Sequence, residues 1–155
     1  MTDNEHFASV SDLAAARAML TFDPLEPTFT AGLARDGLRI FIRDHKKRDL
    51  PVGDRTLEAH YGRFVFTQSR KGVKEARRLA LDVAYGLEPR EAMIAGHPAR
   101  VYELGADPGP DDIDGPMPSV VTWHDGEMFF LIASHEMKVE ELIPVAMSIY
   151  ARRSG

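Results

Sequence analysis

The fold is decided by residues 120–133, VVTWHDGEMFFLIA, in which two apolar segments flank a turn signal. The signal is the pair Asp125-Gly126, because glycine reaches positive φ without strain and such pairs favour two-residue turns. The stretch therefore predicts a β-hairpin. An amphipathic segment that ends near Tyr150 follows it directly.

The predicted turn sets the pairing of the two strands. Trp123 is expected opposite Met128, and Val121 opposite Phe130. One face of the hairpin is then wholly apolar, with Val121, Trp123, Met128, Phe130 and Ile132. The other face is polar beside the turn and apolar further away, at Val120, Phe129 and Leu131. This pattern is typical of a sheet with one face fully covered and the other partly covered.

The spacing of apolar residues and the positions of residues that end helices or form turns predict the remaining elements. A short helix is expected to begin near Ser9, with Ser9 and Asp12 as a capping box. Residues 73–85 fit both a helix and a strand, and their Lys/Glu/Ala/Arg/Leu composition favours a helix. The predicted strands cover residues 37–43, 56–61, 63–68, 92–95 and 99–104. A C-terminal helix has one apolar face, formed by Val139, Leu142, Ile143, Ala146 and Tyr150.

Together these elements predict one α+β domain over residues 1–155, with residues 1–8 as a disordered start. We expect an antiparallel sheet of about five to seven strands with helices packed on one face, the C-terminal helix covering Trp123. The 155 residues suffice for one continuous core. No apolar run reaches the roughly 18 residues of a membrane-spanning helix.

Composition narrows the function. The formal net charge of −5 argues against nucleic-acid binding, which needs a basic surface. The absence of cysteine excludes disulfides, thiolate metal sites and a cysteine nucleophile. The first residues lack the basic and apolar parts of a signal peptide, which favours the cytoplasm.

Two acidic or histidine-containing segments resemble metal sites only in part. In the acidic loop 107–115, alignment with a calcium-binding EF-hand loop puts Pro110 and Val121 at ligand positions, where neither offers a side-chain oxygen. His124 and Glu127 are expected to form a surface ion pair beside the turn. His135 would lie about 30 Å from His124 along the strand, too far to share a metal. The sequence therefore predicts no metal site and no cofactor.

One basic cluster stands out, formed by Arg43, His45, Lys46, Lys47 and Arg48. It has two interpretations: a patch for phosphate or an acidic partner, or a charged hairpin tip that keeps a sheet edge soluble. No aromatic residues interleave with it to stack on bases, which favours the hairpin tip.

Catalytic motifs are missing from the sequence. It has no Gly-x-Ser-x-Gly elbow, no glycine-rich phosphate loop and no His-Glu-x-x-His motif. This favours a non-catalytic binding or sensor domain over a small enzyme with a site in the concavity of the sheet. A further alternative is a carrier of an apolar ligand, in which Val120, Phe129 and Leu131 line a groove. Residues 73–85 would otherwise cover that face. The expected partner is a protein or an apolar small molecule.

Much of the chain resembles a family. The segments are WHDGEMFFL (123–131), VEELIPVAMSI (139–149), IAGHPA (94–99), and SVSDL (9–13) to FDPLEP (22–27). They resemble a domain of unknown function found in bacterial anti-sigma-factor-like and lipoprotein-like chains. The resemblance implies a curved, half-barrel antiparallel sheet with helices on one side, a place outside the cytoplasm, and a binding or sensing role without catalytic residues. This chain is then an isolated domain or a cytoplasmic relative.

Overall fold

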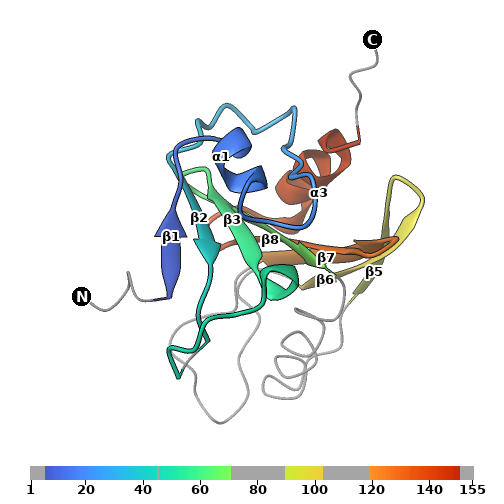
Figure 1. Ribbon diagram of the computed structural model, residues 1–155. Coiled ribbons are helices and arrows are strands. Elements are labelled where there is room, and N and C mark those ends of the chain that lie inside the picture. The colour runs from blue at the N-terminus through green and yellow to red at the C-terminus, as the bar shows by residue number, and fades with distance from the viewer. Residues whose placement is uncertain (1–5, 45, 71–89, 103–118, 151–155) are drawn as a thin grey trace, which may run out of the picture.

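The computed structural model describes residues 6–44, 46–70, 90–102 and 119–150. Within these ranges, eight strands form one antiparallel sheet in the order β1-β2-β3-β4-β8-β7-β6-β5 (Figure 1). The strands are β1 (Phe7–Ser9), β2 (Gly37–Phe41), β3 (Thr56–His60), β4 (Val65–Arg70), β5 (Arg90–Ile94), β6 (His97–Tyr102), β7 (Ser119–Asp125) and β8 (Met128–Ser134). The helices are α1 (Leu13–Arg17), the 3-10 helix η2 (Val52–Asp54) and α3 (Val139–Ser148).

The predicted antiparallel sheet is confirmed, but the count of five to seven strands was too low. The strand that the sequence did not predict is β1, which pairs with β2 and places Phe7 opposite Phe41. The capping-box prediction took Ser9, the last residue of this strand, for the start of a helix. A three-residue edge strand is too short to show a period, so its pairing depends on the neighbouring strand.

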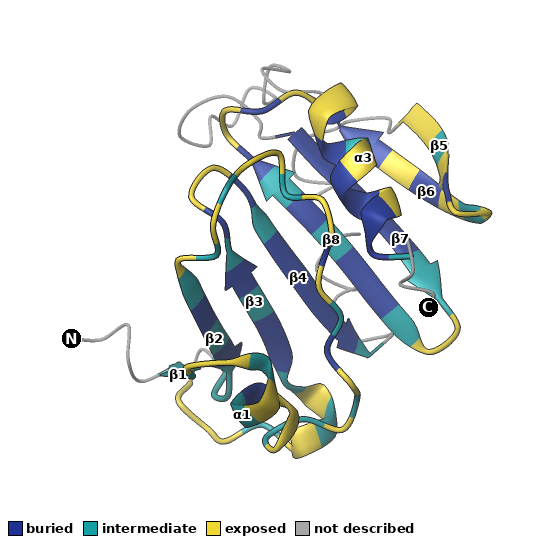
Figure 2. Cartoon of the chain, turned by 90° about the horizontal axis from the view of Figure 1, so that it is seen from above, coloured by how far each residue is buried: buried dark blue, intermediate teal, exposed yellow. Residues whose placement is uncertain are grey.

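Helices α1 and α3 lie on the same face of the sheet, called here the first face (Figures 1 and 2). Strand alternation buries a row of side chains under them, because every second residue points to this face. The buried residues include Leu38, Ile40, Leu57, Phe66, Val101, Val121, Trp123, Phe130 and Ile132. Helix α3 packs on β7 and contributes Val139, Leu142, Val145 and Ala146 to the same core. The expected covering of Trp123 by the C-terminal helix is therefore confirmed.

The register of the β7–β8 hairpin differs from the prediction by two residues. Trp123 pairs with Phe130, and Asp125 pairs with Met128, so the turn consists of Gly126 and Glu127. Gly126 has a φ of 60° and Glu127 has no positive φ, which is typical of a type II′ turn with glycine first. A shift of two residues preserves the side-chain alternation, so the predicted apolar face is correct.

Helix α1 begins one turn later than predicted. Its N-cap is Asp12, whose Oδ1 accepts a hydrogen bond from Ala15 N at 2.8 Å. An aspartate at this position satisfies a backbone N–H at the helix start and suits the helix dipole. The sequence prediction placed the N-cap at Ser9, three residues too early. Ser9 does not cap the helix because it is paired in the sheet.

The segment between α1 and β2 crosses the first face and is held there by a buried glutamine. Gln68, on β4, has no exposed surface. Its Nε2 donates to the carbonyl oxygen of Leu25 at 2.8 Å, and Leu25 N donates to its Oε1 at 2.9 Å. The side-chain amide thus satisfies both backbone groups of Leu25, which would otherwise be left unpaired.

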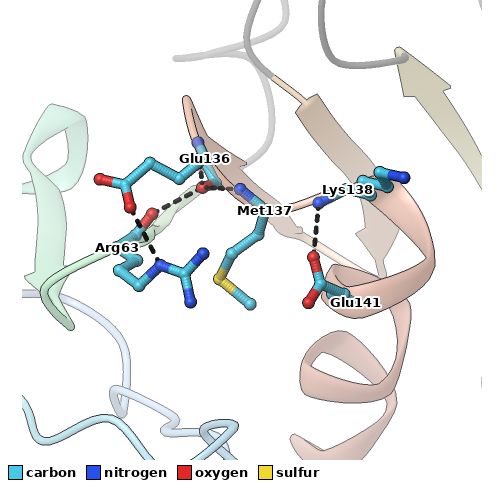
Figure 3. Close-up of polar contacts among 6 residues, drawn as sticks. Arg63, Glu136, Met137, Lys138 and Glu141 are labelled. Carbon is cyan, nitrogen blue, oxygen red and sulfur yellow. Dashed lines mark hydrogen bonds and ion pairs between the residues drawn. The ribbon is translucent and has the colours of Figure 1, made fainter.

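A buried serine fixes the corner between β8 and α3. Ser134 Oγ donates to the carbonyl oxygen of Arg63 at 2.6 Å and accepts from the backbone N–H groups of Glu136 and Met137. Figure 3 shows these neighbours together with the exposed ion pair between Arg63 and Glu136, whose atoms lie 3.0 Å apart. The corner therefore ties the β3–β4 turn to the start of α3.

Replacing Ser134 with alanine should lower the free energy of unfolding by about 1–3 kcal/mol, because three backbone groups lose their partner. Glu136→Gln is the matched control, since it removes only the exposed ion pair and should cost less than about 1 kcal/mol. Chemical denaturation of both variants measures the difference. Equal losses would contradict the role given to the serine.

Among the described residues, no helix has the length and apolar character that crossing a membrane requires.

Candidate functional site

The face of the sheet opposite the helices, called here the second face, is polar at both ends. One row of cross-strand partners crosses all eight strands on this face. In order from β1 to β5 through the sheet, the row is Ser9, Arg39, Glu58, Thr67, Leu131, Thr122, Arg100 and Glu91. Its centre is uncharged, and its charged residues lie near the two edges of the sheet.

The predicted groove residues lie in the central part of this face. Phe129 has no exposed surface and Val120 is 8% exposed, whereas Leu131 is partly buried. Residues 73–85, the segment that would otherwise cover this face, lie outside the described residues. The groove therefore stays a prediction.

An open pocket of about 460 Å³ adjoins these groove residues on the side of β5. Strands β5, β6 and β7 form it, and its lining residues are Glu91, Ala92, Met93, Pro98, Ala99, Arg100, Thr122, Trp123 and His124. Two of them are ladder partners of the groove, because Thr122 pairs with Leu131 and His124 pairs with Phe129. The pocket and the predicted groove are thus parts of one surface.

The lining of this pocket combines apolar and hydrogen-bonding groups. Met93 is 58% exposed, the highest value among the large hydrophobic residues of the described part, and Pro98 lies opposite it in the ladder. Arg100 lies between Glu91 on one side and Thr122 on the other. Such a surface suits a ligand with an apolar body and a polar or anionic end.

A hydrogen-bonded network lies on the first face of the sheet, at the same end as this pocket. Trp123 Nε1 donates to Tyr150 Oη at 3.0 Å, and that hydroxyl donates to Asp125 Oδ2 at 2.8 Å. His97 stacks on the ring of Tyr150, and its Nε2 lies 3.6 Å from the same carboxylate oxygen. Burial raises the pKa of Tyr150 to about 12; the bond from Trp123 opposes this and the bond to Asp125 adds to it.

This pKa shift predicts a loss of stability at high pH. The folded state holds the neutral phenol, so its contribution is complete below the ordinary tyrosine pKa of 10.0 and disappears as the pH rises through about 12. Unfolding free energies measured across this window should fall less steeply for Tyr150→Phe than for the parent protein. Tyr61, whose pKa is also raised by burial, is present in both proteins and cancels. Identical slopes would contradict the assignment.

The basic cluster lies on a hairpin whose charged side chains are partly paired with one another. Arg43 and Asp49 form an antiparallel bridge, and their side chains pair at 2.9 Å. Arg48 pairs with Asp44, also at 2.9 Å. Backbone hydrogen bonding from Arg48 lowers the pKa of Asp44 despite some opposing desolvation. These contacts neutralise part of the positive charge within the tip, and His45 lies outside the described residues.

The histidine and acidic residues near the β7–β8 turn make other contacts than those predicted. His124 lies opposite Phe129 in the ladder and contacts its ring edge-on, so the expected position of His124 opposite Glu127 was wrong. The two-residue shift in register moves Glu127 into the turn, where it pairs with Arg70 at 2.8 Å. His135 follows β8 at its far end. Within the described ranges no three His, Asp or Glu side chains are close enough to hold a metal, and the acidic loop 107–115 lies outside them.

Sequence reasoning missed the pocket residues Met93, Pro98, Arg100 and Thr122. The signal was present in β6, where polar or imino residues 98 and 100 alternate with buried Ala99 and Val101. That alternation shows that residues 98 and 100 lie on the second face. It does not show which strands lie beside β6. The pocket appears only when β5 and β7 are aligned on either side of β6.

No protein-family model, no curated protein and no solved structure matches this chain. The function is therefore inferred from the geometry of the chain itself.

Proposed function

We propose that this chain is a non-catalytic binding domain that holds an amphipathic ligand on the second face of its sheet. The ligand's polar end lies in the pocket formed by β5, β6 and β7, and its apolar body extends toward Leu131, which is only partly buried. The observation that carries the proposal is the pocket of about 460 Å³, which adjoins apolar residues of the same face.

The lining chemistry supports this type of ligand. Exposed Met93 and Pro98 provide apolar contact area, since a methionine adapts to irregular ligand shapes. Arg100 presents a planar, permanently charged group that suits a carboxylate or phosphate end. The resemblance described above implies the same binding or sensing role, and so agrees with the proposal.

A fluorescent fatty acid is a suitable probe, because its carboxylate and acyl chain match the two parts of the surface. Placing a negative charge in the pocket by Met93→Glu should weaken its binding about tenfold, because the new carboxylate repels that of the fatty acid and replaces an apolar contact. Met147→Glu is the matched control: Met147 is 47% exposed but lies on α3, away from the second face. It should leave the affinity unchanged.

Absence of binding to the parent protein, or equal weakening in both variants, would exclude this surface as the binding site. Native mass spectrometry of the purified parent protein complements the titration, since a co-purified apolar molecule would identify the natural ligand.

A further inference from the structure

A second open pocket, of about 310 Å³, lies at the opposite end of the second face. It is formed where β1, β2 and β3 meet, and its lining residues are Ser9, Asp36, Gly37, Leu38, Arg39 and His60. It shares no residue with the pocket of β5, β6 and β7, so what it binds is independent of the function proposed above.

One wall of this pocket is an arginine that is held in a fixed position. Arg39 Nε donates to Glu58 Oε1 at 3.0 Å, and its guanidinium carbon lies 3.6 Å from the centre of the Phe7 ring. His60 Nε2 lies 3.2 Å from the same Glu58 oxygen, so the histidine wall is fixed by the same carboxylate. Within the described part of the chain the two Nη atoms of Arg39 make no hydrogen bond. They are donors in the right arrangement for a ligand carboxylate.

The floor of the pocket is open because residue 37 is glycine. A Cβ built at Gly37 would lie 3.4 Å from His60 Cβ and 3.7 Å from its Cγ. Its φ is not in the left-handed region, so the backbone does not require glycine here. The missing side chain therefore provides space beside His60 rather than conformational freedom.

The rim of the pocket carries a carboxylate of opposite charge. Asp36 is exposed, and its Oδ1 accepts from Gly62 N at 3.3 Å, while its other oxygen makes no hydrogen bond within the described ranges. At the rise of a strand, the Cα atoms of Asp36 and Arg39 lie about 10 Å apart. Both residues line the pocket beside Gly37.

We propose that this pocket binds a free α-amino acid. A simple anion offers no donor to the carboxylate of Asp36, and a simple cation offers no acceptor to the Nη atoms of Arg39. A zwitterion satisfies both, with its carboxylate on the Nη atoms of Arg39 and its ammonium group on Asp36. The ring of His60 and the space above Gly37 accommodate the carbon between them.

The test is ligand-observed NMR and calorimetry with a panel of free L-amino acids, with acetate and methylamine as probes that carry one charge each. At least one amino acid should bind, and both single-charge probes should bind about tenfold more weakly or not at all. Asp36→Asn keeps an acceptor for Gly62 N but removes the charge, and should weaken amino-acid binding about tenfold.

Gly37→Ala fills the floor and should also weaken binding, whereas Gly53→Ala is the matched control. A Cβ at Gly53 meets no atom within 4 Å, and its φ is not in the left-handed region. The proposal is overturned if no amino acid binds at about 10 mM, if acetate binds as well as the amino acids, or if Asp36→Asn and Gly37→Ala both leave the affinity unchanged.

Discussion

Replacing Trp123 with alanine should lower the free energy of unfolding by about 3–5 kcal/mol, the range for deleting a large buried aromatic side chain. Trp123 is 1% exposed and packs on Phe130, with ring centroids 5.2 Å apart. The substitution also leaves the hydroxyl of Tyr150 without its donor. Denaturant melts measure the loss.

Trp123→Phe separates packing from hydrogen bonding in the same position. It retains most of the apolar contact but loses the bond to Tyr150, and should cost clearly less than the alanine variant. A loss below about 1 kcal/mol for Trp123→Ala would contradict the placement of this side chain in the core.

The second large effect is expected at Gln68. Substituting leucine keeps the volume but leaves the N–H and the carbonyl group of Leu25 without partners on the first face. At about 1–3 kcal/mol for each of the two unsatisfied groups, the variant should be destabilised by about 2–6 kcal/mol. The segment before β2 should also lose local order, since Gln68 fixes it at Leu25.

Amide hydrogen exchange distinguishes this local effect from a general loss of stability. In Gln68→Leu, exchange should accelerate most at Leu25. Phe29 provides the internal control, because its N–H donates to Ser148 Oγ at 3.0 Å, an attachment that does not involve Gln68. Equal acceleration at both amides, or unchanged exchange at Leu25, would show that the glutamine does not hold the segment.

The sequence predicted which side chains face the core better than it predicted which residues pair. In the β7–β8 hairpin, the alternation of apolar residues defines the faces, and any register shift of two residues satisfies it equally. The choice between Asp125-Gly126 and Gly126-Glu127 as the turn depends on the φ of single residues, which a dipeptide preference does not determine.

Long-range contacts account for most of what the sequence did not predict. Gln68 occupies a core position because it meets the backbone of Leu25, 43 residues earlier in the chain. A polar residue in a strand otherwise suggests a solvent-facing position. The pockets also depend on strand order, which local sequence patterns do not determine. One pocket, for example, brings together Met93 of β5 and His124 of β7.

The proposed binding surface is tested most directly by mapping amide chemical-shift changes while the fluorescent fatty acid is added to the parent protein. We expect the largest changes in β5, β6 and β7, at Met93, Arg100 and His124, and little change in α1. Changes centred on α1 and the first face, or no saturable change anywhere, would contradict a binding domain that uses the second face of its sheet.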